Sequence, residues 1–378
     1  MNHQTTYDCI VIGGGITGSA LAYELAKRKL KVLLLEKDQF INNATTCSYG
    51  GLPYQAGTNS EISSLFAQSI QIYRQLSEEL EQNIEFRELD LLLTIDSTEN
   101  PQEVAQQYSQ CHELPELLSV DSACKLEPLL NPESISGALR LSHAHVNATR
   151  VNMAYQNAFK RLSGEIRYEK VTDLIRKTNQ IQGVVTNANK YYGSYTIVSA
   201  GGLSRSLLES IGITSKIYFT NCVVLKVPAQ KKLQLNVMLM PATIKRFTLE
   251  AKMSQTDLLW QNLTPEIQES IVDIGAVQFQ DGSIYLGQAS HIISDPFANL
   301  DLDWSQRQIK AGIERLLPKF VDLPFTAQNC LVAFSGDPNR PMMGAIPLWS
   351  GIYLFSGFTK TILLAPVLAR ALAEQIST

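Results

Sequence analysis

The stretch Tyr7–Lys37, YDCIVIGGGITGSALAYELAKRKLKVLLLEK, decides the fold of this 378-residue chain. Tyr7–Ile12 is a short apolar run of strand-forming residues that ends at Gly13. Ala20–Lys29 is rich in helix formers, and Lys31–Leu35 is a second apolar run. A strand, a helix and a second strand within about thirty residues are typical of the βαβ unit of a parallel sheet.

The turn between the first strand and the helix carries the pattern G-x-G-x-x-G at Gly13, Gly15 and Gly18. In this pattern the first glycine allows the tight turn, the second lets the backbone approach a pyrophosphate, and the third lets the helix pack on the sheet. Glu36 follows 18 residues after Gly18, where a carboxylate accepts hydrogen bonds from ribose hydroxyls. The spacing predicts a dinucleotide site, and by itself it leaves FAD and NAD open.

Length and composition favour an ordinary globular protein of two domains, because 378 residues exceed the usual ~100–200 per domain. The net charge is −4, which gives no basic face and makes nucleic acid an improbable partner. Met1–Thr6 lacks the pattern of a secretory signal, and no apolar run reaches the ~18 residues of a spanning helix. We therefore expect a cytoplasmic protein, with peripheral membrane association left open.

The cysteines give no metal-binding pattern. None of the six forms a C-x-x-C pair, and their spacing fits no zinc site, so we predict reduced thiols and no metal. They are Cys9, Cys47, Cys111, Cys124, Cys222 and Cys330.

Hydrophobic periodicity places further elements along the chain. We expect helices at Glu61–Gln82, Val151–Leu162, Trp304–Leu317 and Thr361–Gln375. We expect strands at Leu89–Ile95, Glu165–Lys170, Gln180–Asn187, Tyr195–Ser199, Ile217–Val227 and Gly351–Phe355. Val272–Gln288 is expected to form paired strands, because Asp281–Gly282 is a turn signal between apolar runs.

Four stretches of the chain resemble the flavoprotein family that includes D-amino-acid oxidase, glycine oxidase, sarcosine oxidase and the D-amino-acid and opine-type dehydrogenases. They are Tyr7–Lys37, Ala44–Leu52, Thr196–Gly202 and Ser356–Pro366. The resemblance implies non-covalent FAD as the cofactor. It also implies an α/β fold in which a discontinuous Rossmann-type FAD-binding domain is joined to an α+β substrate domain on a mixed or antiparallel sheet.

The resemblance also implies domain boundaries and cofactor contacts. The FAD domain would comprise 1–85, 140–212 and 330–378, and the substrate domain 86–139 and 213–329. The implied FAD contacts are Gly13, Gly15, Ile16, Thr17, Gly18, Glu36, Lys37, Thr45, Thr46, Ser48, Gly50, Gly51, Leu52, Val171, Ala200, Gly201, Gly357, Phe358, Thr359, Lys360, Thr361 and Ile362. The N-terminus of the last helix would stabilise the reduced flavin, and Lys360 could add its charge.

The implied reaction is oxidation of a C–N bond in an amine or amino-acid derivative by hydride transfer to flavin N5. Relatives hold the substrate carboxylate with an arginine before a stretch that resembles Arg340–Pro341 and Gly344, but Ala333 stands at that position here. We therefore expect glycine and simple D-amino acids to be poor substrates, with Arg246 as the candidate carboxylate ligand. The five histidines offer no evident general base.

Other functions remain open at this stage. The same fold could serve a dehydrogenase that passes electrons to a quinone or a partner subunit rather than to oxygen. The missing arginine would also suit a non-catalytic FAD-binding subunit. The residues leave the substrate, the electron acceptor and the oligomeric state undetermined.

Overall fold

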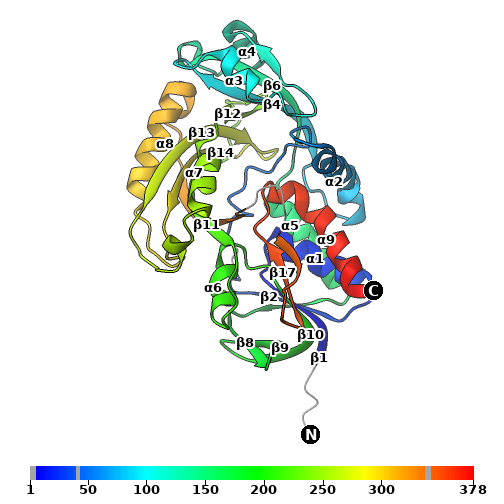
Figure 1. Cartoon of the computed structure of the whole chain (residues 1–378). Coiled ribbons are helices and arrows are strands. Elements are labelled where there is room, and N and C mark those ends of the chain that lie inside the picture. The colour runs from blue at the N-terminus through cyan, green and yellow to red at the C-terminus, as the bar shows by residue number, and fades with distance from the viewer. Residues whose placement is uncertain (1–5, 40–42, 337–341) are drawn as a thin grey trace.

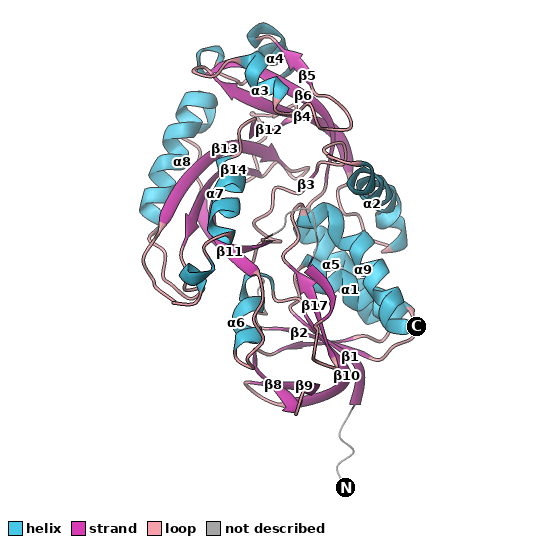
Figure 2. Cartoon of the chain, viewed as in Figure 1, coloured by secondary structure: helices cyan, strands magenta, loops and turns pink. Residues whose placement is uncertain are grey.

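The computed structural model describes residues 6–39, 43–336 and 342–378, and within these ranges the chain forms two β-sheets with helices packed on them (Figures 1 and 2). The architecture is the predicted α/β one, with a Rossmann-type sheet and a second, mixed sheet.

The first sheet has the strand order β16-β17-β10-β1-β2-β7, with β9 and β8 continuing from β10. Its central strands β17, β10, β1, β2 and β7 pair in parallel, as the glycine-rich βαβ unit predicts. The strands are β1 (Thr6–Ile12), β2 (Val32–Glu36), β7 (Glu165–Tyr168), β8 (Val171–Lys177), β9 (Gln180–Thr186), β10 (Lys190–Val198), β16 (Met342–Ala345) and β17 (Ile352–Ser356).

Four helices pack together on one face of this sheet and share its largest apolar core (Figure 2). They are α1 (Ile16–Lys27), α2 (Ser60–Glu79), α5 (Ala148–Arg161) and α9 (Thr361–Ser377). The short helix α6 (Ser204–Glu209) packs on the opposite face, where a separate core contains Ile10, Leu33 and Leu208.

The second sheet has the order β15-β11-β14-β13-β12-β4-β6-β3, with β5 beside β6. All its pairs are antiparallel except β12 with β4. The strands are β3 (Gly51–Leu52), β4 (Arg87–Asp96), β5 (Glu116–Leu118), β6 (Ile135–His145), β11 (Ile217–Val227), β12 (Met238–Pro241), β13 (Glu269–Gln278), β14 (Ile284–Ile292) and β15 (Thr326–Ser335). Helix α8 (Leu302–Leu316) covers one face of this sheet. Three shorter helices lie around the sheet (Figure 1): α3 (Pro101–Gln106), α4 (Val120–Leu126) and α7 (Lys245–Ser254).

The predicted long elements are present, with ends shifted by a few residues, but several other elements were not predicted. Strand β8 has mostly exposed side chains and no apolar run, and the strands β6 and β15 and the helix α7 were also not predicted. The proposed domain boundaries at 140 and 330 also fall inside β6 and β15, which lie wholly in the second sheet. The ladder between β4 and β6 continues to the pair Arg87–His145, so residues 140–145 belong with that sheet. In the described part of the chain, no helix is long and apolar enough to cross a membrane.

Candidate cofactor and substrate site

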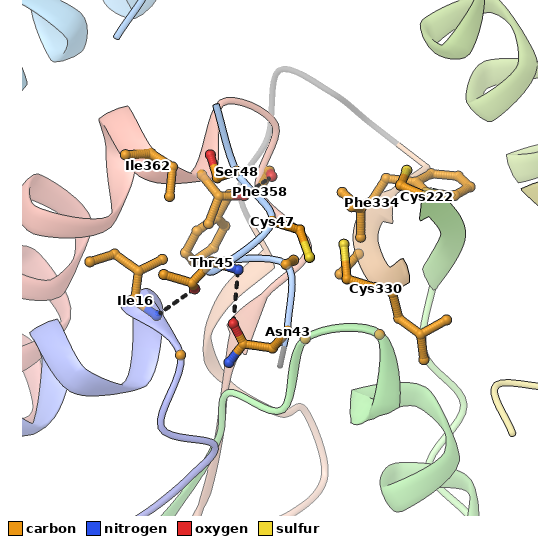
Figure 3. A pocket seen from close by; sticks show the side chains of 18 of the residues that line it. Ile16, Asn43, Thr45, Cys47, Ser48, Cys222, Cys330, Phe334, Phe358 and Ile362 are labelled. Carbon is orange, nitrogen blue, oxygen red and sulfur yellow. Dashed lines mark hydrogen bonds between the residues drawn. The ribbon is translucent and has the colours of Figure 1, made fainter. Parts of the chain in front are cut away.

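A large cavity of about 1190 Å³ lies where the two sheets meet. Its wall combines the glycine-rich turn, the segment around Thr45, the start of α9 and strands of the second sheet (Figure 3). Small-molecule sites commonly measure ~300–1,000 Å³, so this cavity has room for a dinucleotide and a second molecule.

The turn before α1 forms a cradle at one end of the cavity. Gly13 has a φ of +107°, a conformation that residues with a side chain rarely adopt. Gly15 is the N-cap of α1 and faces the cavity. The Ile16 N–H donates to Thr45 Oγ1 at 3.0 Å, and Thr45 N–H donates to Asn43 Oδ1 at 2.9 Å (Figure 3). A helix N-terminus with a bare glycine beside it suits a pyrophosphate.

Glu36 lies at the end of β2, as the fingerprint predicts, and its carboxylate is buried. It accepts hydrogen bonds from Gly14 N–H at 2.7 Å and from Asp38 N–H at 3.1 Å. The Gly14 carbonyl in turn accepts from Asn152 and Gln156 of α5, at 3.0 and 2.9 Å. These two amides fix the cradle, and no local pattern predicts them because they lie more than 130 residues from the turn.

Most of the predicted cofactor residues line this one cavity. Those that do are Gly13, Gly15, Ile16, Thr17, Glu36, Lys37, Thr45, Ser48, Gly51, Val171, Ala200, Gly201, Gly357, Phe358, Thr359, Lys360, Thr361 and Ile362. Gly18, Thr46, Gly50 and Leu52 are outside the lining. Gly18 and Gly50 serve close packing instead, because a Cβ on either would lie 1.9 Å from a backbone oxygen, that of Gly13 or Val146.

The N-terminus of α9 opens onto the cavity, at the position where the resemblance places the flavin. Lys360 precedes it with a φ of +53°, and its ammonium lies 5.4 Å from the centre of the Phe66 ring. Burial lowers the pKa of Lys360. Its side chain thus reaches toward α2, and the residues Phe358–Ile362 form this part of the cavity wall.

Three cysteine thiols meet at the wall between the two sheets. Cys222 and Cys330 pair across β11 and β15, and the sulfur atoms of Cys47 and Cys330 face each other (Figure 3). A hydrogen bond from Cys330 and the charge of Lys226 lower the pKa of the Cys47 thiol, and the same contact together with burial raises the pKa of Cys330.

Arg246, in the first turn of α7, also lines the cavity. Its Nε is 3.6 Å from Glu250 Oε1, and its Nη1 contacts the weak acceptor Cys222 Sγ at 3.9 Å. Nε is buried and has no hydrogen-bond partner in the described part of the chain. Although burial opposes its charge, Glu250 and Cys222 raise the pKa of Arg246, so a permanent cation with available donors faces the cavity.

His143 of β6 lines the cavity, although it was not among the predicted site residues. Burial lowers its pKa to about 3, so the imidazole is neutral at ordinary pH. Neither ring nitrogen has a hydrogen-bond partner among the described residues. No local motif could reveal it, because its position depends on the pairing of β6 with β4.

Ala333 lies on β15 opposite Phe219 and lines the cavity with a methyl group. This position therefore provides no positively charged side chain to the cavity. The predicted match at Arg340–Pro341 lies outside the described residues. Gly344 is described, on β16, and it is not part of the cavity lining.

A family model described as FAD dependent oxidoreductase matches residues 8–375. The chain therefore belongs to the family of FAD-dependent oxidoreductases, and the resemblance found in the sequence is confirmed. The bare glycine turn, the buried Glu36 and the open start of α9 fit FAD.

Individual relatives are distant. Glycine oxidase of Geobacillus kaustophilus is 25% identical over 241 residues, which are 60% of this chain and 63% of that protein. Peroxisomal sarcosine oxidase of Homo sapiens is 26% identical over 211 residues, 55% of this chain and 53% of that protein. These matches span less than two thirds of either relative. The solved structure of glycine oxidase from Bacillus cereus superposes with a TM-score of 0.78 at 21% identity, covering 98% of this chain and 97% of that one, which supports the same fold.

Proposed function

We propose that this protein is an FAD-dependent oxidoreductase that oxidises the C–N bond of an amine or amino-acid derivative. The observation that carries the proposal is the guanidinium of Arg246, whose Nε is buried, in the same cavity as the dinucleotide cradle. A planar guanidinium binds a carboxylate through paired hydrogen bonds, and relatives named glycine oxidase and sarcosine oxidase act on small amino acids.

Bound FAD would supply the hydride-accepting chemistry, held by the glycine-rich turn, Glu36, the segment around Thr45 and the backbone of Phe358–Ile362. The protein's own part is then to bind and orient the substrate. Arg246 would hold its carboxylate, and the apolar walls would exclude water and strengthen that ion pair. The backbone N–H groups at the start of α9 would favour negative charge close to them.

We propose that FAD is bound without a covalent link, by the cradle and Glu36. Acid precipitation of the purified protein should release the flavin into the supernatant as intact FAD. Yellow colour that stays with the precipitate would contradict this. We also propose a cytoplasmic location, which the reduced thiols predicted from the cysteine spacing would suit.

The decisive experiment is an anaerobic screen that follows the flavin absorbance near 450 nm, a wavelength general to flavins, as each amine or amino acid is added. We expect at least one carboxylate-bearing amine to bleach the flavin. Arg246→Ala should lower the second-order rate of bleaching about a hundredfold or more, because an unpaired buried carboxylate costs about 3 kcal/mol. Unchanged kinetics in Arg246→Ala would remove this residue from the site.

Two outcomes would favour the other candidates. If no compound bleaches the flavin and a second chain co-purifies, the protein is a non-catalytic FAD-binding subunit, a function that the absence of a cation at Ala333 favours. The electron acceptor follows from the rate at which dithionite-reduced protein reoxidises in air: fast reoxidation indicates oxygen, and slow reoxidation indicates a quinone or a partner subunit.

A further inference from the structure

One face of three adjacent strands in the second sheet lines the cavity with apolar side chains. The register of β4, β6 and β12 places Leu91 beside both Leu141 and Met238, and Leu93 beside Met240. All five side chains belong to the cavity wall. We call these five residues the Leu–Met strip.

The strip is not needed for the core on the other side of the sheet. The alternate residues of the same strands, such as Leu92 and Leu239, point to the opposite face and pack in the core that includes α8. Side chains alternate across a strand, so these residues pack in that core, whereas the strip packs in a second apolar cluster on the other face and also lines the cavity. An apolar wall inside a ligand cavity favours an apolar part of the ligand.

His143 lies two residues after Leu141 on β6, on the same face as the strip, and it also lines the cavity. Its two ring nitrogens are buried and lack partners within the described ranges. Buried polar atoms are nearly always hydrogen-bonded, and an exception inside a cavity is explained when the ligand supplies the partner.

Gly51, in the segment Ala44–Leu52 that is expected to contact the cofactor, leaves space beside His143 and Met238. A Cβ at Gly51 would lie 2.8 Å from His143 Nε2 and 3.1 Å from Met238 Cε. The absence of a side chain at Gly51 therefore gives His143 and Met238 their place in the cavity.

We propose that the substrate is an amino-acid derivative with an apolar group of about four carbons or more. This proposal rests on the function proposed above. The carboxylate binds at Arg246, the apolar group lies on the Leu–Met strip, and a polar atom of the substrate hydrogen-bonds to His143, which acts as a positioning residue. Glycine-sized substrates leave the strip and His143 without contacts.

Binding of straight-chain alkanoates to the FAD-loaded protein tests the strip without any turnover. The probes run from acetate to hexanoate, and binding is followed by the change in flavin absorbance. Each added methylene should lower the Kd about fourfold, the factor that corresponds to ~0.8 kcal/mol per buried methylene. Equal Kd values for acetate and hexanoate would overturn the proposal.

Variants with a larger side chain in the Leu–Met strip test whether the alkyl chain of the probe binds there. Leu91→Phe and Met238→Phe should weaken hexanoate binding at least tenfold and leave acetate binding unchanged. Leu89→Phe is the matched control, because it lies on the same face of β4 outside the cavity wall. Flavin content and unfolding temperature identify any variant that fails to fold, and the other filling variant then decides. An equal loss in Leu89→Phe would overturn the placement.

His143 is tested by substitution with a substrate found in the screen. His143→Leu should raise KM at least tenfold, with a smaller change in kcat, and His143→Gln should restore most of the loss. Equal kinetics of the Leu and Gln variants would overturn the role of His143.

Turnover separates this inference from the function on which it rests. N-alkylglycines and 2-aminoalkanoates of increasing length should bleach the flavin faster than sarcosine and glycine. Faster bleaching by sarcosine, with a Kd independent of chain length, overturns the strip and leaves the oxidoreductase function standing. Chain-length-dependent binding with no bleaching by any amine supports the strip as an apolar binding site and overturns the function.

Discussion

Gly15 and Gly18 belong to the same turn but have different neighbours. A Cβ at Gly15 would meet Thr45 Oγ1 at 3.4 Å, which is ordinary contact, whereas a Cβ at Gly18 would lie 1.9 Å from Gly13 O. Gly15→Val should therefore fold and lose FAD, because its side chain enters the cradle, whereas Gly18→Ala should unfold more easily even without FAD. Flavin absorbance and thermal unfolding of the apoprotein measure the two effects. A yellow Gly15→Val protein would show that the phosphates bind elsewhere.

Glu250 should make carboxylate binding depend on pH. Burial raises the pKa of Glu250, although Arg246 opposes the shift. As the pH falls through this raised pKa, Glu250 takes up a proton and no longer compensates the charge of Arg246, so the affinity for an anion increases. In Glu250→Gln the affinity for butanoate should be about tenfold higher at neutral pH, a change of ~1.4 kcal/mol, and nearly independent of pH. Thr220, which donates to Glu250 Oε1 at 2.9 Å, can donate to the glutamine in the same way.

At the scale of elements, α9 depends on α2 for its geometry near the cavity. Pro366 has no N–H to donate to the Ile362 carbonyl one turn earlier, and the Tyr73 hydroxyl of α2 donates to that oxygen instead. The Ser69 hydroxyl likewise donates to the Leu363 carbonyl. Helix α2 thus completes the hydrogen bonding of the first turns of α9.

Tyr73→Phe should lower the free energy of unfolding by about 1–3 kcal/mol, because it leaves a buried carbonyl without a donor and removes little else. FAD affinity should fall with it, since the start of α9 lines the cavity. The matched control is Tyr23→Phe. The hydroxyl of Tyr23 donates to the partly exposed Glu79 at 3.2 Å, so its loss leaves no buried acceptor without a donor. Equal unfolding free energies for Tyr73→Phe and the wild type would contradict this account.

At the scale of the whole molecule, stability should fall in mild acid. Burial lowers the pKa values of His143 and His145 to about 3, whereas the unfolded chain binds these protons near pH 6.5. Between these values the unfolded state binds more protons, so folding is strongest above pH 6.5 and weakens as the pH falls. Each histidine contributes up to about 1.4 kcal/mol per pH unit.

Urea unfolding at pH 7.5, 6.0 and 5.0 measures this slope in the wild type and in His143→Leu. The variant should lose less stability on acidification, because one of the two buried imidazoles is gone. Buried carboxyls with raised pKa values, such as Glu127 and Asp273, act in the opposite direction in both proteins and cancel in the difference. Parallel pH profiles would show that His143 is not responsible.

The dinucleotide-binding half of the molecule could be predicted because its determinants are local. The strand, turn, helix and strand of Tyr7–Lys37 are neighbours both in sequence and in space, and glycine spacing at a turn has few structural solutions. The family resemblance then extended the prediction to distant segments such as Gly357–Ile362, which line the cavity.

Only the tertiary structure decided the substrate half. The Leu–Met strip takes its residues from three strands that are far apart in the chain, and their register brings Leu91, Leu141 and Met238 into one row. Arg246 and His143 are separated by about a hundred residues and share no motif, so no spacing rule links them. A short sequence pattern specifies the turn that can hold phosphates, but the wall that faces the substrate depends on strand pairing and burial, which arise only when the whole chain has folded.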